Sequence, residues 1–96
     1  MKKFVFLMYG YEEPTPQVME AWGAWFGELG DKFVDSGNPF TGGREVTKAG
    51  SKTLTPEMSP ATAYCIVNAE SMDDAEKLLA SCPIIDSVRV YECVTM

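Results

Sequence analysis

The chain has 96 residues, of which 46% are hydrophobic and 11% aromatic, which predicts one compact domain over residues 1–96. Fourteen acidic against eight basic side chains give a net charge of −6, which excludes a nucleic-acid partner because phosphates would be repelled. With no histidine and three scattered cysteines, the composition predicts no metal site.

The first apolar segment, Lys3 to Tyr9, is predicted to be a central β-strand because both of its faces are apolar. This segment is too short for the apolar core of a signal peptide, and it runs directly into Glu12 and Glu13. No stretch approaches the 18 apolar residues of a membrane span. We therefore expect a cytoplasmic protein with no membrane partner.

A long amphipathic helix is predicted to follow, with Thr15 as its N-cap and Pro16 as its first residue. Its predicted end is Gly37, because glycine readily adopts the left-handed conformation after a last helical turn. One stripe of the helix is apolar and is expected to face the core: Val18, Trp22, Trp25, Phe26, Leu29 and Phe33.

Three glycines of this segment, Gly23, Gly27 and Gly30, would form a second stripe without side chains. Each glycine costs roughly 0.5–1 kcal/mol relative to alanine in a helix interior. The repeated cost predicts that another element approaches the backbone closely, and a second helix is favoured over a ligand.

Two short polar strands, 44–48 and 52–55, are expected after the loop that covers 37–43, and their charges suit the edge of a sheet. A longer strand at 61–68 places Tyr64 and Ile66 on one face. Ser71 is predicted to open a second helix that Pro83 ends, and a last strand is expected at 87–94.

These elements predict an α+β domain of ferredoxin-like βαββαβ plan, with both helices on one face of an antiparallel sheet. The other sheet face is also apolar, so we expect a homodimer through this helix-free face. The first strand would separate the strands that carry Cys65 and Cys93 by about 9–10 Å, which is beyond disulfide reach. Both cysteines are expected to be small buried hydrophobes.

Three motifs carry a family resemblance: Trp22-Gly23-Ala24-Trp25-Phe26, Gly37-Asn38-Pro39-Phe40 and Cys82-Pro83-Ile84. With them the chain resembles the YCII-related family, close to the group called DGPF-domain proteins. The resemblance implies a dimeric α+β barrel, and for some members a histidine–aspartate dyad. This chain has no histidine and lacks the Asp-Gly-Pro-Phe motif, although Asp35 falls near the position of the aspartate. A histidine-based mechanism is therefore excluded.

The first functional hypothesis is a small-molecule site between the first helix and the sheet, without a cofactor. Its predicted aromatic walls are Tyr9, Trp22, Trp25 and Tyr64, and its predicted polar groups are Asp35, Asn38 and Arg44. The competing interpretation is that the tryptophans are plain core and that Asn38 and Pro39 form a turn.

Whether the protein is an enzyme stays open. If it is, Asp35 is the candidate base, because a carboxylate beside an aromatic wall can have a raised pKa. The competing interpretation of Asp35 is a solvated surface residue. The second functional hypothesis is a non-catalytic accessory or regulatory dimer that docks on another protein. A deep cavity would favour the first hypothesis, and a filled core with an exposed apolar patch would favour the second.

Overall fold

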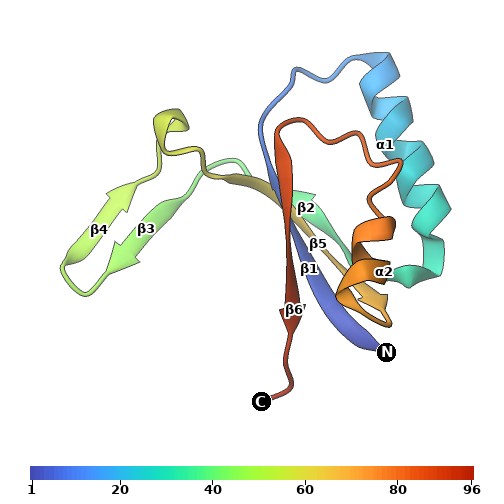
Figure 1. Ribbon diagram of the computed structural model, residues 1–96. Coiled ribbons are helices and arrows are strands. Elements are labelled where there is room, and N and C mark those ends of the chain that lie inside the picture. The colour runs from blue at the N-terminus through green and yellow to red at the C-terminus, as the bar shows by residue number, and fades with distance from the viewer.

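The computed structural model describes residues 1–96 and has an α+β architecture with a mostly antiparallel sheet and two helices (Figure 1). The helices and strands are β1 (Lys2–Tyr9), α1 (Pro16–Leu29), β2 (Phe33–Pro39), β3 (Arg44–Thr47), β4 (Gly50–Thr53), β5 (Ala61–Ala69), α2 (Met72–Lys77) and β6 (Ser87–Cys93). Two 3₁₀ turns, Gly30–Lys32 and Pro56–Met58, complete the chain. The main sheet has the order β2-β5-β1-β6, whereas β3 and β4 form a separate two-stranded sheet.

Strand β1 is central, as predicted, because it pairs with β5 on one side and β6 on the other. Phe4, Phe6 and Met8 are buried on one face of β1. Its opposite face is only partly buried, so β1 is covered on one side and not on both. β1 also separates Cys65 of β5 from Cys93 of β6, and both thiols are free, as predicted. Cys93 is exposed, which corrects the expectation that it is buried.

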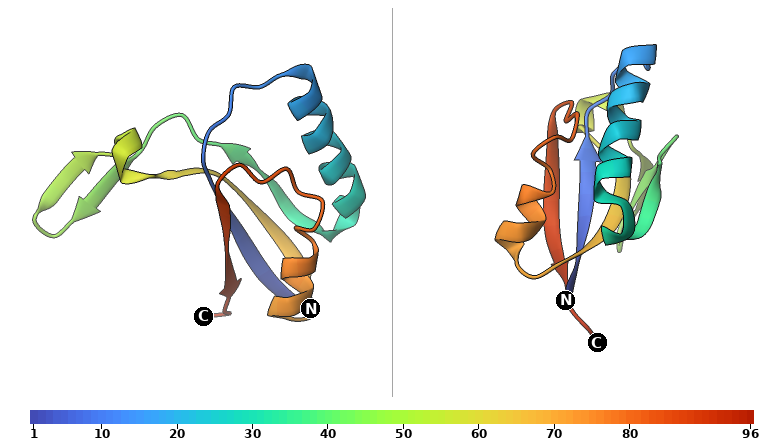
Figure 2. Two further views of the ribbon diagram at one scale, coloured as in Figure 1. Left: turned by 45° about the horizontal axis from the view of Figure 1, so that its top comes forward. Right: turned by 90° about the vertical axis from the view of Figure 1, so that its right-hand side faces the viewer.

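The helices α1 and α2 cover the same face of the sheet (Figures 1 and 2). Between helices and sheet lies a core of nine buried residues: Phe4, Phe6, Met8, Trp25, Leu29, Cys65, Val67, Ala69 and Ala75. Trp25 is 1% exposed and its indole Nε1–H donates to the carbonyl of Leu78, 2.8 Å away. Since a buried indole N–H needs an acceptor, this bond fixes α1 relative to the end of α2.

The N-terminus of α1 matches the prediction, because the Thr15 side chain accepts a hydrogen bond from the Val18 backbone N–H and Pro16 is the first helical residue. The C-terminus does not match. The helix ends at Leu29, where Gly30 has a φ of +49° and its N–H bonds to the Phe26 carbonyl. The predicted helical end at Gly37 is therefore wrong by two turns.

Residues after the helix form an edge strand instead of a continued helix. Phe33 packs against the core from β2, with its ring in edge contact with Trp25 at 5.6 Å between centroids. Phe33 thus packs against the core, as the predicted helical stripe required, but it does so from a strand and not from a helix. Two irregularities interrupt the pairing of β2 with β5, and Gly37, with φ of +79°, lies beside the second.

The glycine stripe of α1 faces open space. A Cβ added at Gly23 or Gly27 would have no neighbouring atom within 4 Å. The predicted close approach of a second helix is therefore wrong at both positions. Helix α1 contacts the turns that follow α2 through its side chains, including Glu28, which accepts a hydrogen bond from the Ser81 hydroxyl, and not through the glycines.

The strands β3 and β4 form a projecting hairpin, which we call the arm (residues 44–53). All eight of its strand residues are exposed, and it extends away on the side of the sheet opposite the helices (Figures 1 and 2). The prediction that these strands extend the edge of the main sheet is wrong, since β2 occupies that edge. The arm raises the radius of gyration to 14.6 Å, against about 12.5 Å for a compact chain of this length.

The second helix begins as predicted, because the Ser71 side chain accepts a hydrogen bond from the Asp74 backbone N–H. It is shorter than predicted and ends at Lys77, well before Pro83. Hydrogen-bonded turns follow, including the bond from the Cys82 N–H to the Leu79 carbonyl. Neither α1 nor α2 has the length and hydropathy that a membrane-spanning helix needs.

Gly37 should be far more sensitive to substitution than Gly27. A Cβ at Gly37 would lie 1.7 Å from the Tyr64 carbonyl oxygen in a left-handed backbone conformation. We expect Gly37→Ala to lower the free energy of unfolding by about 2–4 kcal/mol. The control Gly27→Ala should raise it by about 0.5–1 kcal/mol because the helix gains propensity without a clash. Urea unfolding at one fixed protein concentration measures both, and equal effects would contradict this assignment.

Candidate functional site

A cavity of about 320 Å³ lies between the N-terminal half of α1 and the sheet. Residues of α1, of the ends of β1 and β2, of β5 and of the segment before β6 surround it. Its lining includes Met8, Tyr9, Tyr11, Glu12, Met19, Trp22, Phe26, Ser36, Gly37, Asn38, Pro39, Thr62, Ala63, Tyr64, Cys65, Ile84, Ile85, Ser87 and Val88. Twelve of its 20 residues are hydrophobic, so the walls suit an apolar or aromatic molecule.

The polar groups of the cavity are few and uncharged, except for Glu12 in the segment between β1 and α1. They are supplied by Ser36, Asn38, Thr62 and Ser87. Hydroxyl and amide groups can each donate and accept a hydrogen bond, so this set can orient a neutral polar substituent. No basic side chain lines the cavity, which disfavours an anionic ligand.

The structure brings together four of the seven residues predicted for the site: Tyr9, Trp22, Asn38 and Tyr64 all line the cavity. Trp25 does not line it, because its ring is enclosed in the core and contacts Trp22 edge-on at 5.8 Å. Arg44 does not line it either, since it belongs to the exposed arm.

Asp35, the candidate base, also lies outside the lining of the cavity. It pairs with Ile66 of β5, and Ile66 pairs in turn with Val5 on the face of the sheet that carries no helix. Its two oxygens each accept one hydrogen bond, from the Gly37 N–H at 2.8 Å and from the Tyr64 hydroxyl at 2.9 Å. The carboxylate therefore supports the local strand geometry on the helix-free side.

Tyr64 connects this carboxylate with an aromatic pair. Its ring stacks on Phe40 with centroids 5.8 Å apart and an angle of 11° between the planes. The hydrogen bond to Asp35 is the largest of the causes that raise the pKa of the Tyr64 phenol, because ionisation would remove the proton that the phenol donates to the carboxylate.

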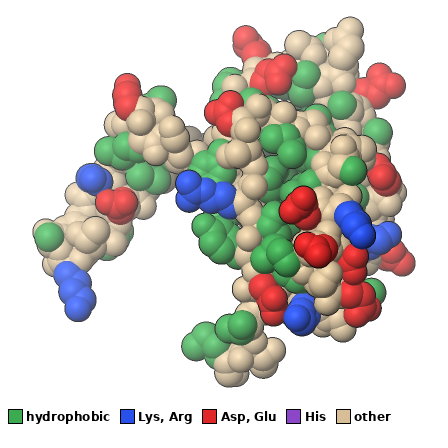
Figure 3. Space-filling view, in the orientation of Figure 1, with side chains coloured by type: hydrophobic (Ala, Val, Ile, Leu, Met, Phe, Trp, Pro, Cys, Tyr) green, Lys and Arg blue, Asp and Glu red, His purple; other side chains and the backbone are tan.

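The helix-free face of the main sheet bears further apolar side chains. Register places Val5 and Leu7 of β1 beside Ile66 and Tyr64 of β5, and all four are only partly buried. At one end, the Arg89 guanidinium lies 4.9 Å from the centroid of the Tyr9 ring. Figure 3 shows hydrophobic side chains gathered on the body where it faces the arm.

A second, more polar hollow of about 760 Å³ lies at the base of the arm. Phe40, Gly43, Leu54 and Thr55 line it from the arm side, and Asp86 lines it from the body. Its volume is larger than that of the first cavity, but only five of its 15 residues are hydrophobic. It offers little apolar wall for a small molecule.

The cysteines do not supply a nucleophile to the cavity. Burial raises the pKa of the Cys65 thiol to about 12 and that of the Cys82 thiol to about 11. Both groups are therefore protonated at neutral pH, and a protonated thiol is a poor nucleophile. Nor does any group of three or more His, Cys, Asp or Glu residues come together that could hold a metal ion.

Several lining residues were absent from the predicted site, notably Met19, Phe26, Ile84 and Ile85. The helical spacing places Met19 and Phe26 beside Trp22, so the same stripe that indicated Trp22 could have indicated them. The sequence held one signal for the two isoleucines as site residues: they are large and apolar, and they follow Pro83 outside any strand. Which wall they complete depends on how the segment before β6 folds back.

No family model, curated protein or solved structure matches this chain.

The pairing of Tyr64 with Asp35 predicts a pH effect. The pKa of the Tyr64 phenol is raised above 10.0, so the bond stabilises the fold below pH 10 and this contribution is lost as pH rises through the raised pKa. In Asp35→Asn the pKa should fall back toward 10.0. Ultraviolet absorbance titration of tyrosinate measures it, with Tyr64→Phe to assign the signal. An unchanged titration in Asp35→Asn would contradict the pairing.

Proposed function

We propose that this protein is a homodimer that binds a small, uncharged, largely apolar or aromatic molecule in the cavity between α1 and the sheet. The cavity itself is the observation that carries the proposal. Its volume of about 320 Å³ lies at the lower end of the range for small-molecule sites, which is roughly 300–1,000 Å³. The proposed ligand is therefore a compact molecule, such as one with a single substituted aromatic ring.

Within this proposal, Trp22 and Phe26 of α1 contribute the aromatic wall. The rings of Tyr9 and Tyr64 are engaged on the helix-free face by Arg89 and Asp35, so the predicted aromatic wall is cut back to the residues of α1. Asn38 pairs in register with Tyr64 and shares its face, so the predicted orienting amide is not part of this proposal. Trp22 is well suited because its ring is only partly buried and is held between Trp25 and Phe26. A ring fixed in this way loses little conformational freedom when a ligand contacts it.

The proposed dimer rests on surface area. The chain exposes 6960 Å², whereas a compact monomer of this mass exposes about 5,500 Å². The difference exceeds the ~800 Å² that each partner buries in a standard interface. The partly buried Val5, Leu7 and Ile66 on the helix-free face provide the apolar centre that such an interface needs.

The strand order supports a finer fold assignment as part of the same proposal. In order along the chain, the four strands of the main sheet are β1, β2, β5 and β6, and they lie as second, third, first, fourth. This arrangement, with α1 and α2 as the two crossovers, agrees with a ferredoxin-like plan. We propose that the chain is a dimeric α+β barrel of the YCII-related type, in which the arm is an insertion between the second and third sheet strands.

One observation favours the alternative, a non-catalytic accessory or regulatory dimer. The candidate base Asp35 is turned to the helix-free side and is occupied by hydrogen bonds from Gly37 and Tyr64. In the binding proposal Asp35 therefore has a structural role, and catalysis by Asp35 would need the ligand to lie on the helix-free face.

The three free cysteines fit a reducing compartment, and the proposal includes a cytoplasmic location.

A large side chain that fills part of the cavity should weaken binding. Ala63 lines the cavity, and Ala63→Phe would occupy part of its volume. A fragment set of singly substituted neutral aromatic molecules, followed by tryptophan fluorescence and by ligand-detected NMR, should give binders to the wild type. Ala63→Phe should weaken them by about tenfold or more, because their apolar contact area is lost.

The matched control is Ala24→Phe, on the exposed side of α1 outside the cavity. It should leave fragment binding unchanged. Absence of any binder to the wild type, or equal binding by the two variants, would contradict the proposed site.

The dimer has its own test. Ile66→Asp places a charge at the centre of the helix-free face, so the variant should sediment as a monomer where the wild type is a dimer. Met72→Asp, an exposed apolar residue on the helix side, is the matched control and should remain dimeric. Sedimentation equilibrium measures both. A wild type that stays monomeric at all accessible concentrations would contradict the proposal.

A further inference from the structure

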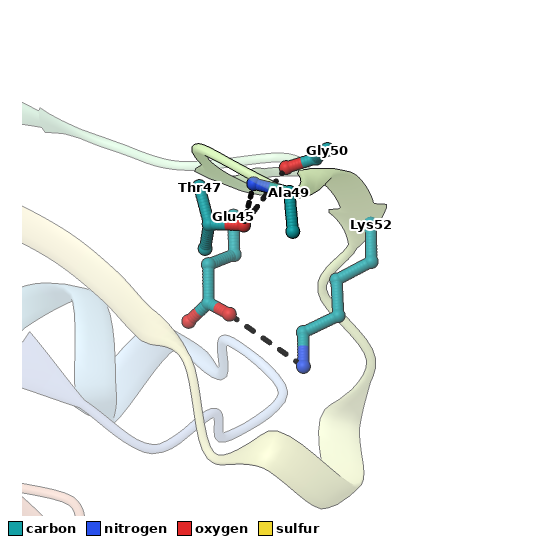
Figure 4. Close-up of polar contacts among 5 residues, drawn as sticks. All are labelled: Glu45, Thr47, Ala49, Gly50 and Lys52. Carbon is teal, nitrogen blue, oxygen red and sulfur yellow. Dashed lines mark hydrogen bonds and ion pairs between the residues drawn. The ribbon is translucent and has the colours of Figure 1, made fainter.

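The arm lacks a core that could hold it as an independent element. It has only two strands of four residues each, and an isolated two-stranded hairpin is marginal in water. Beyond its backbone pairing it has one ion pair, between Lys52 and Glu45 at 3.5 Å, and two hydrogen bonds of the Thr47 hydroxyl at the turn (Figure 4). Val46, its only large apolar side chain, is 75% exposed.

The charge of the arm is opposite to that of the rest of the chain. Residues 44–53 hold three of the eight basic side chains, Arg44, Lys48 and Lys52, and only one of the fourteen acidic ones, Glu45. The other 86 residues therefore carry five basic and thirteen acidic side chains. Figure 3 shows acidic side chains spread over the body that bears the helices. A basic arm and an acidic body attract each other across an interface.

The arm points away from the body of its own chain. It projects from the side of the sheet that carries no helix, so the uncovered apolar face and the arm lie on the same side of the molecule (Figures 1 and 2). The second hollow lies between the base of the arm and the body. A second molecule that covers the face would therefore also come within reach of the arm.

We propose that the arm docks on the body of a second copy of this chain, beside the helix-free face, and that each copy clasps the other in this way. The inference rests on the proposed homodimer and adds the segment that stabilises it. A two-fold axis makes the contact self-complementary, because each copy presents one basic arm and one acidic body. The chain thus supplies both halves of the contact, and no other partner is needed to account for them.

The geometry of the arm allows it to be removed cleanly. The Leu54 N–H donates to the Gly43 carbonyl at 2.9 Å, so the two ends of the arm are already paired. Replacement of residues 44–53 by an Asn-Gly turn keeps this pairing and shortens the hairpin. We expect the dimer dissociation constant, from sedimentation equilibrium, to rise at least about tenfold in this variant.

A charge variant tests the same contact without deletion. Arg44→Glu with Lys48→Glu reverses two arm charges and should weaken the dimer, most strongly at low salt. Lys32→Glu with Lys77→Glu makes the same change of net charge on the body and is the matched control. A larger effect of the arm pair supports the proposal, and equal effects overturn it.

The outcomes separate the two proposals. A monomeric wild type overturns both the dimer and the docked arm. A dimeric wild type whose dissociation constant rises less than about tenfold on removal of the arm overturns only the docked arm. Hydrogen exchange on the unmodified protein is an independent check: amides of residues 45–53 should exchange more slowly in the dimer than after dilution to monomer, and equal rates overturn the proposal.

Discussion

The buried indole of Trp25 is the interaction on which the arrangement of this protein depends. Its ring is enclosed by the core, and its N–H has one acceptor, the Leu78 carbonyl at the end of α2. An unpaired N–H at this depth would cost roughly 1–3 kcal/mol. The bond therefore holds α1 against the end of α2, and both helices occupy one face of the sheet (Figure 1). The apolar residues of the opposite face are left without cover from this chain.

The same packing creates the cavity. Trp25 fills the space between the C-terminal half of α1 and the sheet, together with Leu29 and Phe33. Toward its N-terminus α1 presents Trp22 and Met19, and the chain after Pro83 closes the other wall with Ile84 and Ile85. Of the two neighbouring tryptophans, one is thus structural and the other is available to a ligand. Spacing alone does not distinguish them, since both lie on one helical stripe.

The uncovered face and the projecting arm can be understood as two parts of one surface. A chain with only nine buried residues has a small core of its own, and small domains commonly bury further area against a partner. In the proposed dimer the helix-free faces supply apolar contact, and the arms supply charge complementarity. The site between α1 and the sheet is then distinct from the contact surface, so ligand binding and assembly can be tested separately.

The sequence by itself determined the type and approximate place of most elements, because alternation in β1 and β5 and caps at Thr15 and Ser71 are local signals. It also indicated Tyr9, Trp22, Asn38 and Tyr64, which line one cavity. Only the tertiary structure decided where α1 ends, because Phe33 fits the apolar stripe of a helix and the buried side of a strand equally well. It likewise decided that residues 44–53 leave the sheet: their polar alternation fits an edge strand and a projecting hairpin alike, and the choice follows from β2 taking the edge beside β5.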